Sequence, residues 1–169
     1  FSILGLLIDG FIKALSPVMK NQSAAGHYGD SMVFILHGID HRNNAPFIAV
    51  EPTPGGWGAW SKGDGADALI NNVNGAFKDI PIEIYENKYP VTIRNYGLRK
   101  DTGGAGTMRG GNGLYKEYTV NTDLYLSLWF ERSITTGWGL FKGKNAKGPI
   151  VEIKHSNGKK ETRLKSNSY

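Results

Sequence analysis

Residues 101–113 read Asp101-Thr102-Gly103-Gly104-Ala105-Gly106-Thr107-Met108-Arg109-Gly110-Gly111-Asn112-Gly113. Consecutive glycines allow positive φ angles and let backbone N–H groups converge on an anion or on another chain segment. A phosphate-binding loop is one interpretation, but such a loop ends in Gly-Lys-Ser/Thr or runs into a helix. Here the stretch runs into residues 114–120, which have a β pattern. We therefore favour a structural turn that packs against Trp57 or Trp138 over a phosphate cradle.

Two other segments have the same character. One is Gly55-Gly56-Trp57-Gly58-Ala59 with the following residues 62–67, and the other joins residues 130–133 to residues 138–143. Glycine contributes 23 of the 169 residues, about twice its usual share. Because the glycines follow no Gly-X-Y period, we expect them in turns and at close backbone approaches.

The first twenty residues have helical periodicity. Their apolar side chains recur at spacings of three and four, which predicts one apolar helix face: Leu4, Leu7, Ile8, Phe11, Leu15, Val18 and Met19. Pro17 and residues 21–23 predict the end of this helix. Asp9 and Lys13 interrupt a run too short for a membrane span, and the basic start and cleavage site of a signal peptide are missing. Because the chain opens inside a helix, we expect a fragment of a larger protein.

Short apolar runs bounded by turn residues predict strands over most of the remaining chain. Residues 32–36, 47–50 and 91–93 are such runs, and Ile80, Ile82 and Ile84 alternate as in a half-buried strand. Two pairs of runs predict hairpins: 115–120 with 124–130 around Asn121-Thr122, and 150–154 with 160–164 around Ser156-Asn157-Gly158. The fold class is therefore α+β: a single domain, residues 1–169, with an N-terminal amphipathic helix, a mostly antiparallel β region and long glycine-rich loops.

Composition and charge exclude several classes of protein. Apolar residues make up 40% and charged residues 21%, which excludes wholesale disorder, and the absence of cysteine excludes disulfides, Fe–S clusters and thiolate zinc sites. Residues 1–140 hold 12 basic and 13 acidic side chains, whereas residues 141–169 hold 8 basic and 2 acidic. A nucleic-acid site needs stacking aromatics beside its cations. After Phe141 this basic end has only His155 and Tyr169, so we expect a solvated face and no nucleic-acid partner.

The glycine clusters, in this order, resemble the C-terminal part of the hydantoinase B family. That family includes the B-type subunits of N-methylhydantoinases, lactamases and acetone and acetophenone carboxylases, and the corresponding half of 5-oxoprolinase. Its pattern Asp-Ser-Gly-Gly-Ala-Gly-x-x-Arg-Gly-Gly-x-Gly matches residues 101–113 at every fixed position except Thr102, which replaces serine. Family elements elsewhere match Gly55–Ala59, Pro81-Ile82-Glu83, Tyr89-Pro90-Val91 and Trp138–Phe141. The resemblance covers nearly the whole chain.

The resemblance implies the C-terminal part of a multisubunit enzyme. In the family, an A-type subunit with an actin-like ATPase fold uses ATP and Mg to phosphorylate the substrate. The B-type subunit then hydrolyses a lactam or hydantoin or carboxylates a ketone. A divalent metal ion in the full B-type subunit is compatible with this chemistry. We therefore expect an A-type partner, the remainder of the B-type subunit and a small cyclic amide or ketone substrate. We also expect a cytoplasmic location without membrane contact. The chain departs from the family where Phe130-Glu131 replaces Ser-Asp and where Lys142 replaces glycine.

Few residues of this chain suit the chemistry that the resemblance implies. Such a site stabilises developing negative charge with arginine or N–H donors in a water-poor pocket. Arg109 lies among glycines, so its guanidinium can reach a phosphate or carboxylate, and Asp101 and Arg132 complete the candidate catalytic set. The alternative is structural: Arg109 pairs with Asp101 or Glu117 and fastens the turn, and Arg132, next to Glu131, is open to the same two interpretations.

Histidines and tryptophans give weaker candidates. His37 and His41 follow the predicted strand 32–36, where two imidazoles in one loop could bind a metal ion, but Asp40 is the one carboxylate nearby and ordinary surface histidines are the alternative. We expect His155, in a hairpin turn, to be exposed. The four tryptophans line either an apolar substrate pocket or the core and interfaces: Trp57, Trp60, Trp129 and Trp138.

Three functions remain open from the sequence. The chain is part of an ATP-dependent amidohydrolase or ketone carboxylase, or it is a structural module that builds the interface of such a complex without catalytic residues of its own. The third is a free-standing β-rich ligand-binding domain, which predicts a soluble monomer. We expect aggregation of the isolated chain instead, because the apolar face of its first helix has lost its neighbours.

Overall fold

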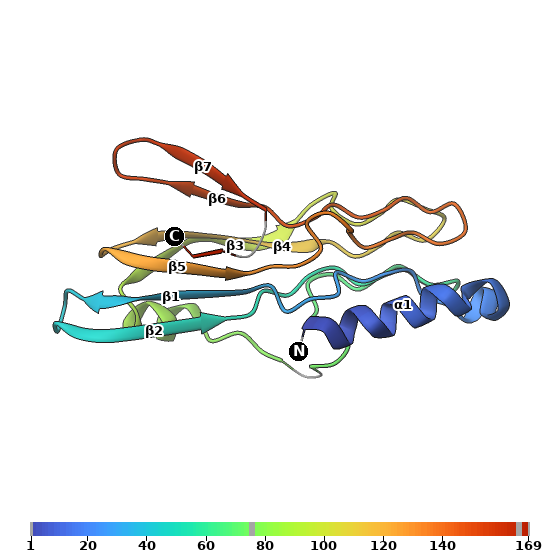
Figure 1. Cartoon of the computed structure of the whole chain (residues 1–169), viewed down its shortest axis with the longest axis horizontal. Helices are drawn as coiled ribbons and strands as arrows, with labels where there is room; N and C mark the ends of the chain where they lie inside the picture. Colours follow the sequence, from blue (N-terminus) through green and yellow to red (C-terminus); the bar gives the residue numbers. More distant parts are fainter. Residues whose placement is uncertain (1, 75–76, 165–166, 169) are drawn as a thin grey trace.

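The computed structural model describes residues 2–74, 77–164 and 167–168 (Figure 1). Along the chain its elements are α1 (Ser2–Met19), the 3-10 turn η1 (Lys20–Gln22), β1 (Val33–Asp40), β2 (Ala45–Glu51), α2 (Ile82–Lys88), β3 (Val91–Arg99), β4 (Gly113–Val120), β5 (Leu124–Trp129), β6 (Val151–Lys154), β7 (Lys160–Arg163) and β8 (Asn167–Ser168). The strands gather at one end of an elongated molecule, and α1 lies beside long loops that reach the other end. The α+β class and the antiparallel sheets are confirmed.

The largest sheet has four strands in the order β2-β1-β5-β8, and each neighbouring pair is antiparallel. β1 is an inner strand, paired on both edges, and its side chains alternate between the two faces of the sheet as in any β-strand. Phe34 and Leu36 are buried on one face, and Leu128 lies opposite Phe34 in β5. This face carries most of the apolar core.

A second layer covers that face. It consists of the antiparallel pair β3-β4 and the short helix α2. The ring of Tyr118 in β4 meets the ring of Phe34 at a centroid distance of 5.2 Å. The buried core joins residues of both layers: Met32, Phe34, Leu36, Ala49, Tyr85, Tyr89, Val91, Leu128 and Phe130.

The strand predicted at residues 80–84 is wrong, because this part of the chain enters α2. Pro81 stands at the N-cap, where its missing N–H breaks no helical hydrogen bond. Tyr85 and Tyr89, four residues apart, are both buried, whereas Ile84 is 56% exposed. Burial therefore follows the helical spacing of the tyrosines and not the alternation of the isoleucines.

The hairpin predicted across residues 115–130 is also wrong. β4 pairs with β3, whereas β5 pairs with β1 and β8 in the other sheet. The connection passes from one layer to the other: the Asn121 N–H donates to the Pro90 carbonyl at 3.0 Å, and Thr122 Oγ1 donates to the Ile39 carbonyl at 3.1 Å. The two strands thus face each other across the core instead of sharing a ladder.

The hairpin around Asn157-Gly158 is confirmed as β6-β7. Gly158 has a φ of +84°, a conformation that an Asn-Gly turn supplies without steric cost. His155 lies at this turn with its side chain 43% exposed, as expected. In Figure 1 the hairpin projects from the rest of the molecule.

Helix α1 is confirmed, and it turns its polar face inward. Gly5, Asp9 and Ser16 are buried against the loops. The apolar face that the periodicity predicted is exposed, at fractions from 36% to 82%: Leu4, Leu7, Phe11, Leu15, Val18 and Met19. In the part of the chain that the structure describes, no helix combines the length and apolarity needed to cross a membrane.

Candidate functional site

Beyond the strands, five extended segments pack side by side without forming a regular sheet. They are residues 24–28, 55–60, 63–69, 102–112 and 137–147, here called the glycine-rich bundle. Backbone hydrogen bonds of 2.8 to 2.9 Å join them: Ala25 N–H to Ala59 O, Gly26 N–H to Trp138 O, Gly111 N–H to Trp57 O and Lys144 N–H to Ala105 O. The predicted glycine clusters therefore meet in one structure.

Close approach, and not positive φ, explains the glycines of this bundle. Among the glycines that the structure describes, Gly29 and Gly158 alone have positive φ, so the glycines of the clusters do not use the positive φ angles that glycine allows. A Cβ on Gly56 would lie 1.9 Å from the carbonyl oxygen of Gly111, and one on Gly104 would lie 2.1 Å from that of Lys144. No side chain fits in such gaps, so the expectation of close backbone contacts is confirmed.

The backbone of residues 109–113 does not fit a phosphate group. Each of its five N–H groups already has an acceptor, at 2.5 to 2.9 Å: Asp64 Oδ1 for Arg109, Gly104 O for Gly110, Trp57 O for Gly111, Asp67 Oδ1 for Asn112 and Thr102 Oγ1 for Gly113. Two of these acceptors are carboxylates, which repel an anion. The stretch is a structural turn against Trp57, and we assign no nucleotide chemistry to it.

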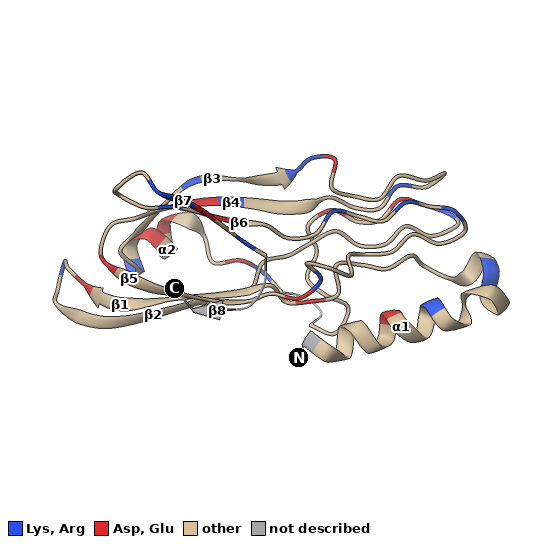
Figure 2. Cartoon of the chain, turned by 45° about the horizontal axis from the view of Figure 1, so that its top comes forward, with Lys and Arg blue, Asp and Glu red and all other residues tan. Residues whose placement is uncertain are grey.

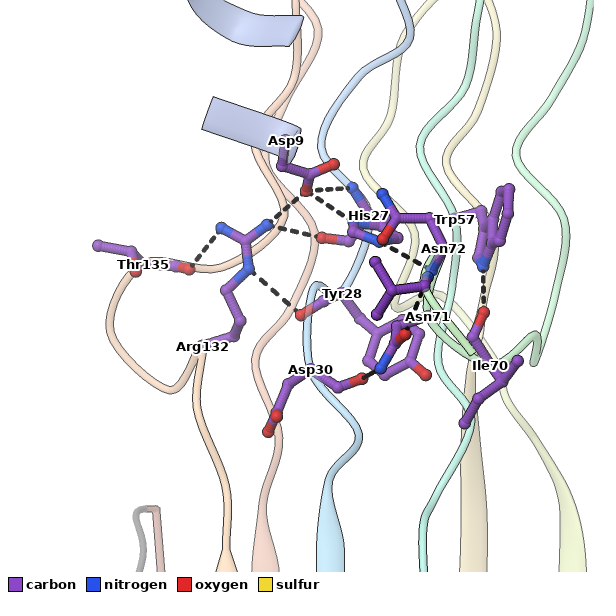
Figure 3. A network of polar contacts seen from close by, with 11 residues as sticks. Asp9, His27, Tyr28, Asp30, Trp57, Ile70, Asn71, Asn72, Arg132 and Thr135 are labelled. Carbon is purple, nitrogen blue, oxygen red and sulfur yellow. Dashed lines mark hydrogen bonds and ion pairs between the residues drawn. The ribbon is translucent and has the colours of Figure 1, made fainter. Parts of the chain in front are cut away.

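Arg132 lies buried where the bundle meets α1 (Figure 3). Its Nη2 donates to Asp9 Oδ2 and to the His27 carbonyl, both at 2.8 Å. Nε donates to the Tyr28 carbonyl at 3.2 Å, and Nη1 donates to the Thr135 carbonyl at 3.3 Å. One guanidinium thus binds a helix and two loops together.

Asp9 and His27 complete what we call the Arg132 cluster. Asp9 Oδ2 also accepts from the backbone N–H of His27 at 3.1 Å and lies 2.7 Å from His27 Nδ1. His27 Nε2 accepts from the Asn72 N–H at 3.4 Å, which assigns the ring proton to Nδ1. The ring of Trp138 lies 4.4 Å from the guanidinium carbon. Burial lowers the pKa of Arg132 below its ordinary value, against the opposite effect of the nearby Asp9 carboxylate.

Buried polar groups continue beyond the cluster (Figure 3). Asp30 Oδ2 accepts from the backbone N–H of Glu131 at 2.8 Å, and Asn71 Nδ2 donates to the Asp30 carbonyl at 3.2 Å. Burial, with the charge of Asp30, raises the pKa of Tyr28 above its ordinary range. Glu131 thus contributes its backbone here, whereas the carboxylate that pairs with Arg132 belongs to Asp9 in α1.

Arg109 and Asp101 lie apart from these buried contacts. Both are exposed, and Asp101 has a φ of +57°. Within the described ranges, the guanidinium of Arg109 has no ion pair. Glu117 accepts instead from Asn95 Nδ2 at 2.6 Å. The predicted structural pairing of Arg109 with Asp101 or Glu117 is therefore wrong, and the guanidinium is free to meet a ligand or a partner.

The structure separates His37 from the loop in which it was predicted. His37 lies inside β1, and its ring stacks on Tyr125 at a centroid distance of 5.3 Å, while His41 lies in the exposed turn that follows. The Arg42 guanidinium binds Asp40 and lowers the pKa of that carboxyl. Among the described residues, no three His, Asp or Glu side chains gather closely enough to hold a metal ion.

The tryptophans divide between the bundle and the surface. Trp57 Nε1 donates to the Ile70 carbonyl at 2.8 Å, and Trp138 packs on Arg132. Trp60 and Trp129 are 48% and 63% exposed. A pocket of about 380 Å³ is lined by none of them, but by Arg99, Ser133, Thr136, residues 146–150 and Leu164.

Comparison with known proteins accounts for the whole described architecture. Residues 1–168 match the family model described as Hydantoinase B/oxoprolinase. The chain belongs to this family. The resemblance drawn from the glycine clusters is thereby confirmed.

Three relatives illustrate the range of the hydantoinase B/oxoprolinase family. A putative B-type component of a D-/L-hydantoinase from Pseudomonas sp. (strain NS671) is 28% identical over 137 residues, which is 81% of this chain and 22% of that protein. The ATP-dependent caprolactamase of Pseudomonas jessenii superposes with a TM-score of 0.72 at 27% identity, over 92% of this chain and 29% of that chain. Acetone carboxylase shares the fold, with a TM-score of 0.53 at 22% identity over 74% and 17% of the two chains. The chain therefore spans less than a third of the length of these relatives.

This family member also contains a buried charge cluster that the sequence did not reveal. Lys116 of β4, with its side chain 6% exposed, forms ion pairs with Glu51 of β2 and with Asp79, the latter at 2.8 Å. Tyr118 Oη donates to Glu51 Oε2 at 3.1 Å, and Tyr96 Oη donates to Asp79 Oδ2 at 2.5 Å. Burial and the Glu51 carboxylate raise the pKa of Tyr118 above its ordinary range. The cluster fixes the two layers against each other.

Proposed function

We propose that this chain is the C-terminal module of a B-type subunit in an ATP-dependent enzyme that opens a cyclic amide or carboxylates a ketone. The family match over residues 1–168 carries this proposal. Ring opening is favoured over carboxylation, because the caprolactamase has the higher TM-score and covers more of the chain than acetone carboxylase does. A cytoplasmic location belongs to the proposal, since the reaction draws on ATP.

The use of ATP follows from the chemistry of the substrate. A ring amide is a poor electrophile, so an A-type partner, with ATP and Mg, would phosphorylate the amide oxygen. Water then adds to the activated carbon, and the ring C–N bond of that adduct breaks to give a free amine and an acyl phosphate. A second water hydrolyses the acyl phosphate, and phosphate leaves with the former amide oxygen. The net reaction consumes a lactam or hydantoin, ATP and two water molecules and yields the opened acid, ADP and phosphate. In this proposal the nucleotide binds to the A-type partner, and the N–H groups of residues 109–113, which already have acceptors, take no part in binding it.

Within this enzyme the geometry favours a structural role for most of the module. Arg132 is buried and fully engaged by Asp9 and by backbone carbonyls, which suits the positioning of α1. The outer face of α1 is apolar, with Phe11 67% and Val18 82% exposed. A surface of this kind is covered by further protein in a working assembly. The remainder of the B-type subunit and the A-type partner are the proposed cover.

A direct role in the reaction has one candidate, Arg109. Its exposed guanidinium carries no ion pair in the described part of the chain. A guanidinium binds phosphate or carboxylate through two parallel hydrogen bonds, as a phosphorylated intermediate would require. This direct role assumes the same enzyme as the structural role. The two roles predict different effects of Arg109→Ala on turnover and on assembly.

Reconstitution of the full-length B-type subunit with its A-type partner tests the function. We expect ADP formation that depends on caprolactam, 5-oxoproline or hydantoin, and little that depends on acetone with bicarbonate. Dependence on the ketone alone would reassign the substrate class. ADP formation that depends on none of these compounds would refute the proposal.

Two variants separate the roles within that enzyme. Arg109→Ala with intact assembly and lost turnover supports a direct role, whereas lost assembly supports a structural one. Phe11→Asp on the outer face of α1 should weaken assembly. Ile134→Asp is its matched control, because Ile134 is 94% exposed and should tolerate the charge.

A further inference from the structure

The loops of the glycine-rich bundle end together where α1 ends (Figure 1). Four segments, here called the distal tip, meet there: residues 19–22, 60–64, 105–109 and 140–144. Three hydrogen bonds join them in turn: Ser61 Oγ to Asn21 O at 2.6 Å, Arg109 N–H to Asp64 Oδ1 at 2.7 Å and Lys144 N–H to Ala105 O at 2.8 Å. Loops that are far apart in the sequence therefore form one surface.

The distal tip is strongly cationic. Its five basic side chains are exposed and have no ion pair within the described ranges: Lys20, Lys62, Arg109, Lys142 and Lys144. Asp64 is the one acidic residue of these four segments, and its Oδ1 already accepts from the backbone of Arg109. Figure 2 shows blue segments on these loops and just beyond the end of α1. A surface with this imbalance attracts carboxylates or other anions.

Exposed apolar side chains lie among these cations. Phe141 is 64% exposed, Trp60 is 48% exposed and Met108 is 37% exposed. Phe141 and Lys142 have φ values of +48° and +73°, in the left-handed region that residues other than glycine rarely adopt. The turn thus holds an aromatic ring and a cation in water at a conformational cost.

We propose that the distal tip is the docking surface for the A-type partner, on a face of that partner where carboxylates surround an apolar socket. This inference rests on the proposed function and names the surface that its assembly uses. Aromatic side chains bury well at the centre of an interface, while unpaired cations around them set orientation and speed association. A single-stranded nucleic acid fits less well, because it stacks successive bases along a groove, and the tip offers two rings on separate loops.

A pair of charge reversals in the full-length B-type subunit tests the inference. Arg109→Glu with Lys142→Glu reverses two cations of the distal tip. Lys154→Glu with Lys160→Glu is the matched control, since these exposed lysines of β6 and β7 give the same change in net charge. Affinity for the A-type partner is measured by interferometry at about 50 mM and about 300 mM salt, and thermal melting checks folding.

The tip variant should bind the A-type partner about 30-fold more weakly at low salt, mostly through slower association, and the control should lose less than about threefold. Arg109→Lys with Lys142→Arg should keep wild-type affinity. Equal weakening in both reversals, or weakening in neither, overturns the inference. So does tight binding of a labelled single-stranded oligonucleotide that the tip variant abolishes.

The two proposals fail in different ways. If the tip variant binds the partner normally but loses turnover, the distal tip contacts substrate and the docking inference is wrong, while the proposed function stands. If the two wild-type proteins bind each other but never hydrolyse ATP with a cyclic amide or ketone, the proposed function fails and the docking result is still measured.

Discussion

Replacing Arg132 with alanine should release α1 from the glycine-rich bundle. The change removes both hydrogen bonds from Nη2, and the Asp9 carboxylate, 5% exposed, keeps His27 as its neighbour. Removing one partner of a buried ion pair costs about 3–5 kcal/mol, because the other charge stays buried. Since about 1.4 kcal/mol corresponds to a factor of ten, the opening of α1 should increase by two to nearly four orders of magnitude.

Amide hydrogen exchange in the full-length B-type subunit measures this opening directly. Protection in α1 should fall by that factor in Arg132→Ala, while protection in β1 and β5 changes little. Arg94→Ala is the control, because Arg94 is exposed and its guanidinium donates to Thr119 on the surface. In Arg132→Lys the charge remains but the fork of donors is lost, so an intermediate loss is expected.

A double-mutant cycle identifies the pair responsible. The single changes are Asp9→Asn and Arg132→Met, and the double variant, which removes both buried charges, should be less destabilised than Arg132→Met alone. The reasoning is refuted if α1 protection in Arg132→Ala falls by less than about threefold, or if the two single changes add without coupling.

Three further predictions concern other parts of the structure. Gly111→Ala should prevent formation of the bundle, because its Cβ would lie 1.9 Å from the Ala66 carbonyl oxygen. Gly97→Ala is the control: its Cβ would have no atom within 4 Å, so this variant should keep the wild-type melting temperature. Equal melting temperatures of the two variants would contradict the close-approach argument. Lys116→Met should lower the free energy of unfolding in urea by about 3 kcal/mol, since it leaves the buried Glu51 carboxylate and the largely covered Asp79 carboxylate without their cation. An unchanged midpoint would show that the ion pairs contribute nothing. Burial raises the pKa of Tyr118 above its ordinary 10.0, so the unfolded chain loses this proton first, and the stability that it contributes is complete below about pH 10 and falls above it. In alkaline denaturation Tyr118→Phe should make the fall of stability with pH shallower. A stability curve parallel to that of the wild type would count against the assignment.

Local signals predicted part of this fold from the sequence. The Asn157-Gly158 turn and the periodicity of α1 depend on neighbouring residues, and both predictions are confirmed. The alternation around Ile82 predicted a strand where the structure has α2, because the burial of Tyr85 and Tyr89 decides the conformation there. Tertiary packing overrode the local pattern there.

The hairpin across residues 115–130 failed for a related reason. Its turn signal was weak, and the pairing is decided by other strands: β4 pairs with the preceding strand β3, and β5 pairs with β1, which lies far away along the chain. Alternation shows that a strand has an inner face but does not show which layer it joins.

The buried polar sites were beyond prediction because their members are distant in sequence. Asp9 and Arg132 are 123 positions apart, and Glu51 and Lys116 are 65 apart. One signal was present: Asp9 shares a helix face with Gly5 and Ser16, so the small and polar face, and not the apolar one, was suited to close packing. The resemblance to the family was the stronger guide, since it uses the order of several motifs at once.

The construction of the glycine-rich bundle has a consequence for biosynthesis. Its segments begin at residue 24 and end at residue 147, and each lies against backbone from a distant part of the chain. The bundle therefore cannot be completed while the nascent polypeptide leaves the ribosome, because its last segment, residues 137–147, contacts segments that emerge much earlier. Until then the exposed helix and the unpaired early strands are in need of chaperones, so a premature stop shortly before residue 137 should yield insoluble protein and not a smaller stable domain.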